Sequence, residues 1–214
     1  SYQPGIDDPR LPVLAMPTKF NDYRGVSANI EEQTKLYDAG QRYYPYADNL
    51  SSSLAQNAKS TYSHITFHRN ENMPVYMYSL GELDLLLAEI ALKGLGNTGK
   101  DAGDHIRDEV VHSINFWYAI NQLSTYGRGT RDAVLYPAKP SPAIIDAWAD
   151  NIRAKFLAAT TTDDKMEILM QQKYIHLNIM SPFELWTELR RTRHPYLEPM
   201  TFTGKIMSPF PERI

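Results

Sequence analysis

Apolar residues change their spacing along this chain near residue 79. In the first 72 residues, Pro, Asn, Ser, Asp and Tyr are frequent, and apolar stretches are short, as at Val13–Met16 and Ile65–Phe67. Such a composition favours turns and isolated extended pieces over long regular elements. From Ser79 onward, apolar residues recur every three or four positions, which is typical of amphipathic helices. The pattern therefore predicts an irregular segment over residues 1–72 and a helical region over residues 73–214.

Five helices are predicted in the second part. Ser79 with Glu82 matches a capping box, and Gly94 stands where a glycine commonly ends a helix. The predicted buried face of this first helix consists of Leu83, Leu86, Leu87 and Ile90. The next four helices are expected to begin at Asp101, Ser141, Thr162 and Ser181, with Pro195 after the end of the last. Their predicted buried positions are Ile106, Val110, Ile114, Trp117 and Ile120; Ile145, Trp148, Ile152 and Phe156; Met166, Leu169, Met170, Tyr174 and Leu177; and Leu185, Trp186 and Leu189.

Successive helices joined by short connections favour antiparallel pairs. We therefore predict a mainly α fold of tetratricopeptide-like helical pairs, with long irregular loops and little β structure. The 34-residue repeat typical of tetratricopeptide arrays is not visible in the sequence.

The composition argues against several kinds of partner and of chemistry. The chain has 214 residues, 43% of them hydrophobic, a formal charge of −3 and no cysteine. The two signs of charge are interspersed, which argues against nucleic acid or an anionic membrane surface as a partner. Because these 214 residues contain no cysteine, they can form no disulfide and carry no thiolate chemistry. We expect the sequence to be part of a longer protein, because it opens and closes in loop-like stretches.

Four tyrosines are the candidate ligand-binding residues: Tyr37, Tyr43, Tyr44 and Tyr46 lie in the loop-like stretch KLYDAGQRYYPYADN. Aromatic rings held outside a helical core can stack on the apolar face of a sugar while neighbouring polar groups bond its hydroxyls. The alternative is that they cover the helical layer and fill the space beneath an irregular segment. By contrast, Trp117, Trp148 and Trp186 fall on predicted helical stripes and are assigned to the core.

Catalytic and metal sites have little support. His64 and His68 lack the glutamate of a zinc-protease motif, and no nucleophile or nucleotide-binding motif occurs. Glu82, Asp84 and Glu89 could be paired carboxylates of a glycosidase. A structural role, bonded to Lys173, Arg190 or Arg191, is the simpler interpretation. We therefore expect no catalytic residues, no metal and no cofactor.

Two helical blocks resemble a known family. Met73–Gly94 is MPVYMYSLGELDLLLAEIALKG, and Glu167–Pro195 is EILMQQKYIHLNIMSPFELWTELRRTRHP. They are similar to the "LL-AEA" helix and the "QK-W … RRT-x-x-P" block of the SusD/RagB-like glycan-binding outer-membrane lipoproteins. Further matches come in family order: Asp8–Pro12 to "DPRL-P", Tyr23–Gly25 to "Y-x-G", and Ser113–Trp117 to "S-I-x-F-W". Tyr174 replaces the tryptophan after "QK", and we expect it to be buried likewise.

The resemblance implies a non-catalytic protein at the bacterial cell surface. Such a protein captures oligosaccharides or, in some branches, peptides, and delivers them to a SusC-like TonB-dependent outer-membrane transporter. It implies one larger SusD-like domain whose N-terminal half, with its lipid anchor, is absent from this sequence and is a partner of the present residues. Without the resemblance, a helical-repeat interaction module or a glycan-cleaving enzyme would remain as alternatives.

Overall fold

The computed structural model describes residues 2–37, 40–42, 59–127, 134–198, 200–202 and 205–207. The main helices are α4 (Leu80–Leu92), α5 (Ala102–Leu123), α6 (Pro142–Ala158), α7 (Thr162–Leu177) and α8 (Pro182–Thr192). Shorter elements are α1 (Leu11–Leu14), α2 (Ile30–Tyr37), a π-helical turn η1 (His64–His68) and a 3₁₀ turn η3 (Asn178–Met180). Strands β1 (Met200–Phe202) and β2 (Lys205–Met207) form one antiparallel pair. The predicted mainly α fold is confirmed.

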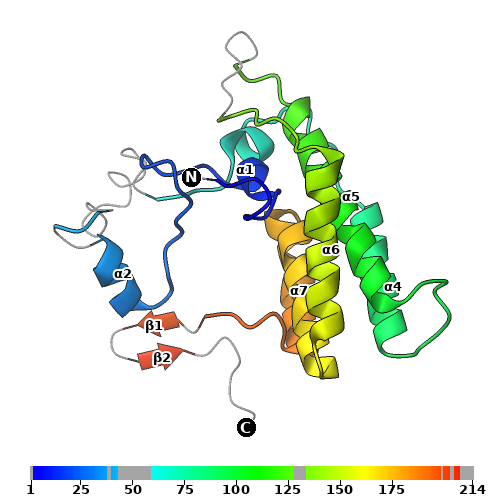
Figure 1. Ribbon diagram of the computed structural model, residues 1–214. Coiled ribbons are helices and arrows are strands. Elements are labelled where there is room, and N and C mark those ends of the chain that lie inside the picture. The colour runs from blue at the N-terminus through cyan, green and yellow to red at the C-terminus, as the bar shows by residue number, and fades with distance from the viewer. Residues whose placement is uncertain are drawn as a thin grey trace.

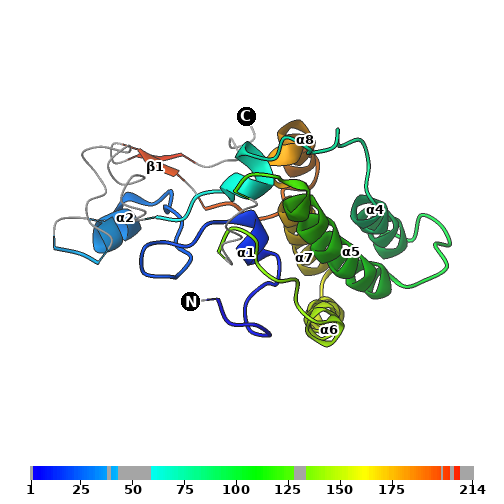
Figure 2. The ribbon, with the colours of Figure 1, turned by 90° about the horizontal axis from the view of Figure 1, so that it is seen from above.

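Helices α4 to α7 run in alternating directions and pack side by side (Figure 1). Figure 2 shows α5 lying between α4 and α6. The predicted inner face of α5 is confirmed, because all five of its apolar positions are buried. Ile145, Ile152 and Phe156 of α6 and Met166, Leu169, Met170 and Leu177 of α7 are buried as expected, and Trp148 is half-buried against the same core.

Side-chain caps begin four of these helices. Ser79, Asp101 and Ser141 each accept a hydrogen bond from a backbone N–H in the first turn, as predicted. For α7 the cap is Thr161, one residue before the predicted start. Ser181 precedes α8 without a capping bond, and Pro195 lies beyond its end as expected. Gly94 follows α4 with a φ of +63°, the left-handed conformation that suits glycine.

The buried face of α4 differs from the predicted one. Leu85 and Ala88 are buried, whereas Leu83 and Leu86 are 38% and 48% exposed. Nearly every position from Leu83 to Ile90 is apolar, so spacing alone could not select a face. Close approach to α7 selects it: a Cβ on Gly81 would lie 2.9 Å from the His176 ring. The helix therefore turns Gly81, Leu85 and Ala88 toward its neighbours and leaves Leu83 and Leu86 exposed.

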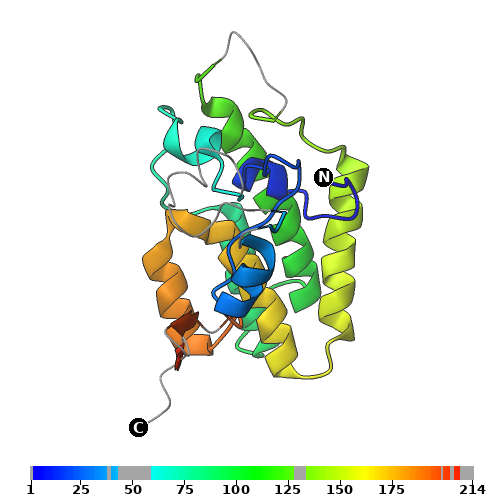
Figure 3. The same cartoon turned by 90° about the vertical axis from the view of Figure 1, so that its left-hand side faces the viewer.

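The first part of the chain is tied to the bundle through α1 and η1. Arg10 is fully buried and bonds Asp8, Ser113 of α5 and Gln172 of α7 (2.7 Å for Arg10 Nη2 to the Gln172 side chain). The Tyr118 hydroxyl donates to the Pro9 carbonyl at 3.0 Å, and α1 packs on α5 (Figure 3). The Asp-Pro-Arg motif is thus a structural anchor that links residues far apart in sequence.

Several large apolar side chains remain at the surface. They include Val75, Met77, Leu80 and Leu83, which lie on α4 or immediately before it. Within the described part of the chain, no helix is both long and apolar enough to cross a membrane.

Candidate functional site

The four predicted tyrosines are not placed by the structure. Tyr43, Tyr44 and Tyr46 lie outside the described residues, and so does the side chain of Tyr37, the last residue of α2. Their role in ligand binding stays a prediction.

Three other aromatic side chains surround a hollow of about 410 Å³ that we call the aromatic hollow. Tyr62 comes from the segment before η1, Tyr174 from α7 and Trp186 from α8. They are 47%, 43% and 56% exposed, respectively. Leu185, Leu189, Leu197, Ile179, Pro182 and Asn178 complete the lining. An accessible pocket with ring faces and few polar groups suits a ligand that has apolar faces of its own.

Two of these aromatic residues overturn the sequence-based expectation. Tyr174 and Trp186 were assigned to the core because they lie at helical spacing among apolar residues, and both are exposed by more than two fifths. Helix α8 carries no buried side chain at all. An apolar stripe has the same spacing whether a neighbouring helix covers it or solvent reaches it, so the pattern could not separate the two cases. The only sequence feature that indicated exposed positions is the presence of two aromatic residues, Phe183 and Trp186, on one short helix.

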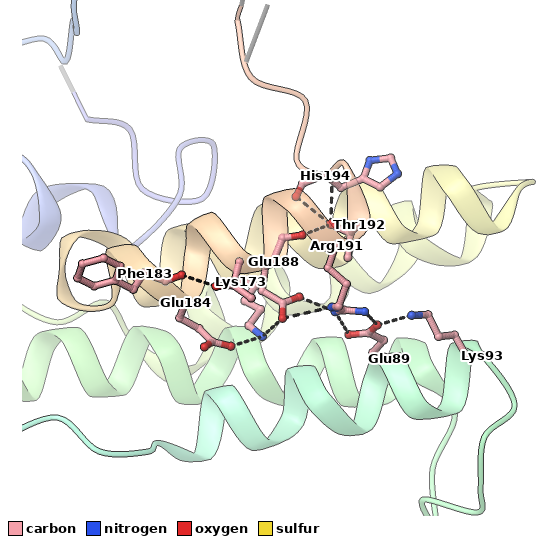
Figure 4. Close-up of polar contacts among 10 residues, drawn as sticks. Glu89, Lys93, Lys173, Phe183, Glu184, Glu188, Arg191, Thr192 and His194 are labelled. Carbon is pink, nitrogen blue, oxygen red and sulfur yellow. Dashed lines mark hydrogen bonds and ion pairs between the residues drawn. The ribbon is translucent and has the colours of Figure 1, made fainter. Parts of the chain in front are cut away.

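The opposite face of α8 is held by a row of ion pairs (Figure 4). Lys173 of α7 lies 3.4 Å from Glu184 and 3.5 Å from Glu188. Arg191 donates two hydrogen bonds to Glu89 of α4, at 2.6 and 2.8 Å, and two more to Glu188. Residues 184, 188 and 191 share one side of the helix, while 185, 186 and 189 line the aromatic hollow on another. The ion pairs thus fix the orientation in which α8 presents Trp186.

The electrostatics of this row are those of a structural clamp. Burial alone would raise the pKa of Glu89, but the bonds from Arg191 and Lys93 outweigh it and lower that pKa. The bonds to Glu89 and Glu188 raise the pKa of Arg191. The predicted pairing of Glu89 with an arginine is therefore confirmed. The other two carboxylates differ: Glu82 accepts a bond from the Tyr76 hydroxyl and Asp84 bonds His112, each at 2.6 Å.

Arg190 has a different position from Arg191. Its guanidinium carbon lies 4.5 Å from the centre of the Trp186 ring. A cation at that distance attracts the ring face and limits its rotation. Arg190 therefore helps to set the orientation of the indole and adds a hydrogen-bond donor beside the aromatic hollow.

This arrangement offers binding groups. The two carboxylates of α8 on its opposite face, Glu184 and Glu188, are both paired with Lys173. Among the described residues, no group of three or more His, Asp or Glu side chains is placed to hold a metal ion.

Comparison with known proteins places the chain in a family. The SusD-like family, described as Susd and RagB outer membrane lipoprotein, matches residues 1–206. A search among curated proteins found no match. A solved SusD homolog from Bacteroides fragilis is similar at a TM-score of 0.60 and 18% identity over 90% of this chain. An outer membrane protein from Bacteroides vulgatus, whose description proposes a role in nutrient binding, is similar at a TM-score of 0.54 and 22% identity over 88% of this chain.

At these identities, the two structural likenesses show the fold. The chain spans 38% and 37% of the two solved proteins, so both contain long stretches with no counterpart in it. The family match, in contrast, extends over nearly all of its residues. The chain belongs to the SusD-like family.

Proposed function

We propose that this chain is part of a non-catalytic cell-surface protein that binds oligosaccharides and delivers them to a TonB-dependent outer-membrane transporter. Family membership supports an outer-membrane lipoprotein, and the Bacteroides vulgatus neighbour has a proposed role in nutrient binding.

The aromatic hollow is the observation that carries this proposal. Pyranose rings have one face of C–H groups, which packs well on an aromatic ring, and hydroxyls at the edge. Tyr62, Tyr174 and Trp186 supply accessible rings from three separate segments, and Arg190 and Asn178 supply hydrogen-bonding groups beside them. The four tyrosines of residues 37–46 are proposed as a second set of stacking groups.

We also propose that other parts of a longer protein cover the exposed apolar face of α4. Leu80, Leu83 and Leu86 are too exposed for a helix packed on both sides, and the solved relatives contain more than twice the length of this chain. In the complete protein, hydrogen exchange at α4 amides should then be as slow as at α5 amides. Rapid exchange along α4 would contradict this.

The binding proposal is tested with the complete protein, oligosaccharides and short peptides in titration calorimetry. The double variant Tyr174→Ala with Trp186→Ala should weaken oligosaccharide binding about tenfold or more, because each stacked ring contributes on the order of 1 kcal/mol. Phe183→Ala is the matched control, since Phe183 is 86% exposed on the same helix and does not line the hollow. The triple variant Tyr43→Ala, Tyr44→Ala, Tyr46→Ala tests the second set.

Three results would contradict the proposal in distinct ways. Binding of peptides in place of oligosaccharides would change the ligand class. New reducing ends, released at catalytic rates, would make the protein an enzyme. Unchanged affinity in the double variant, with loss in the tyrosine triple variant, would move the site from the aromatic hollow to residues 37–46.

A further inference from the structure

A second cavity, of about 510 Å³, is lined in part by Thr61 and His64, which are close in sequence to Tyr62, and we call it the basic cavity. Its lining residues come from three parts of the chain: residues 16–21, residues 61–69, and Tyr126 with Val134 and Leu135. Its volume is within the range of small-molecule sites. Its basic lining residues are Lys19, His64 and Arg69, and no carboxylate is among the lining residues.

The walls of the basic cavity are tied to one another by hydrogen bonds. Ala15 and Tyr62 form a β-bridge, and the Met16 N–H donates to the Thr61 carbonyl at 2.8 Å. On the other side, the Ser124 hydroxyl donates to the Arg69 carbonyl at 2.8 Å. The cavity is therefore preformed, and its backbone needs little ordering when a ligand binds.

The two cations of the basic cavity, Lys19 and Arg69, are exposed. Among the described residues, neither Lys19 nor Arg69 forms an ion pair, although each lies near a ring: Arg69 is 4.3 Å from the centre of Tyr126, and Lys19 is 5.3 Å from that of Phe20. Asp22, close in sequence, bonds Thr18 and pairs with Arg42. Glu71 lines a neighbouring hollow that also contains Arg69 and Tyr126. The positive charges of the basic cavity are thus exposed to an incoming ligand.

His64 is consistent with a positive potential here. Burial lowers the pKa of His64, and the nearby His68 and Arg69 lower it further. The neutral imidazole can hydrogen-bond to a ligand without adding to the charge. Arginine, in contrast, offers two parallel N–H groups that match the geometry of a carboxylate or a sulfate.

We propose that the basic cavity binds the anionic substituent of an acidic oligosaccharide, with Arg69 donating paired hydrogen bonds and Lys19 supplying a second positive charge. The inference rests on the proposed function, because it specifies the class of oligosaccharide. The negative group would be the carboxylate of a uronic acid or a sulfate ester, which share this chemistry.

The test compares three probes on the complete protein by titration calorimetry: a neutral cello-oligosaccharide, an oligogalacturonate of the same length and a chondroitin sulfate oligosaccharide. At least one acidic probe should bind about tenfold more tightly than the neutral one, as expected for hydrogen bonds between charged groups. The better of the two identifies carboxylate or sulfate as the preferred substituent.

The double variant Lys19→Gln with Arg69→Gln should remove that preference and leave neutral binding within about twofold of the parent. Its matched control is Lys35→Gln with Lys100→Gln, which changes the net charge equally at two exposed lysines outside the cavity. The control should retain the preference. Thermal unfolding checks that both double variants fold.

Two results would overturn the inference. One is equal affinity for neutral and acidic probes, which leaves the proposed function intact. The other is equal loss of the acidic preference in both double variants, which would show attraction by overall charge. Failure of all three probes to bind would instead contradict the proposed function itself.

Discussion

Helices α5 and α8 differ in how far their residues are buried. Along α5, eleven residues are buried, and the helix contacts α4, α6, α7, α1 and η1. On α8 no side chain is buried, and the helix is held from one side by ion pairs with α4 and α7. Each helix contains a tryptophan at core-like spacing: Trp117 is fully buried, whereas Trp186 is more than half exposed.

The difference shows that apolar content and accessibility are separate properties. A fully buried residue such as Trp117 cannot reach a ligand, whatever its chemistry. A helix clamped along one face by charged pairs keeps its other face open and correctly oriented. For this reason α5 is the structural centre, and α8 is the element whose side chains can serve binding.

The sharpest test replaces each tryptophan in turn. Trp117→Ala should reduce the free energy of unfolding by about 3–5 kcal/mol, because it removes a large buried side chain and leaves a cavity. Trp186→Ala should cost less than about 1 kcal/mol, since much of the ring is already in water. Chemical denaturation followed by circular dichroism measures both. Equal costs would show that the open face of α8 is part of a core.

A second test uses the buried polar cluster of α5. Burial raises the pKa of Glu109 to about 8, and neither of its carboxyl oxygens has a hydrogen-bond partner among the described residues. Its neighbours are Arg10, at 3.7 Å, and His176, whose pKa burial and Arg10 lower to about 3. Each group therefore remains neutral in the folded protein over a pH range in which it is charged when unfolded.

Glu109 and His176 change the stability of the folded protein with pH in opposite directions. Folded Glu109 holds a proton that the unfolded chain releases above pH 4.5, so its contribution to stability falls as pH rises from 4.5 to about 8. In the unfolded chain His176 binds a proton below pH 6.5, whereas in the folded protein it stays neutral down to about pH 3. Its contribution to stability therefore falls as pH drops from 6.5 to about 3. Between pH 6.5 and 8, stability should decline by up to about 1.4 kcal/mol per pH unit.

Unfolding measured across that window in the parent and in Glu109→Gln isolates the effect. The variant should lose the decline above pH 6.5, because the amide does not ionise. Identical profiles would mean that Glu109 is ionised in the folded protein.

A smaller effect than at Trp117 is expected at the clamp of α8. Glu89→Gln should lower the free energy of unfolding by about 1–2 kcal/mol. The variant replaces the carboxylate that Arg191 bonds with a neutral amide, and the effect is moderate because the Arg191 side chain is partly exposed to water. Ligand affinity should change little, since the carboxylate does not line the aromatic hollow. Parallel denaturation and calorimetry decide this. Selective loss of binding at unchanged stability would assign Glu89 to the site.

How far the sequence predicts this molecule depends on how local each feature is. Helix starts at Ser79, Asp101 and Ser141 were predictable, because a cap is a bond between residues two or three apart. The inner face of α5 was predictable as well, since polar residues separate its apolar ones. The aromatic hollow was not, because Tyr62 lies more than one hundred residues from Tyr174 in sequence and no local pattern links them.

The amino-acid sequence by itself determined the helical class, most helix limits, the α5 core and the motifs that mark the family. Tertiary structure alone decided which face of α4 is buried, that Arg10 joins α1 to α5 and α7, and that Tyr174 and Trp186 are accessible. The physical reason is that hydrophobic periodicity specifies an apolar surface but not its neighbour. Burial depends on close approach, as between Gly81 and His176, and close approach is a property of two segments together.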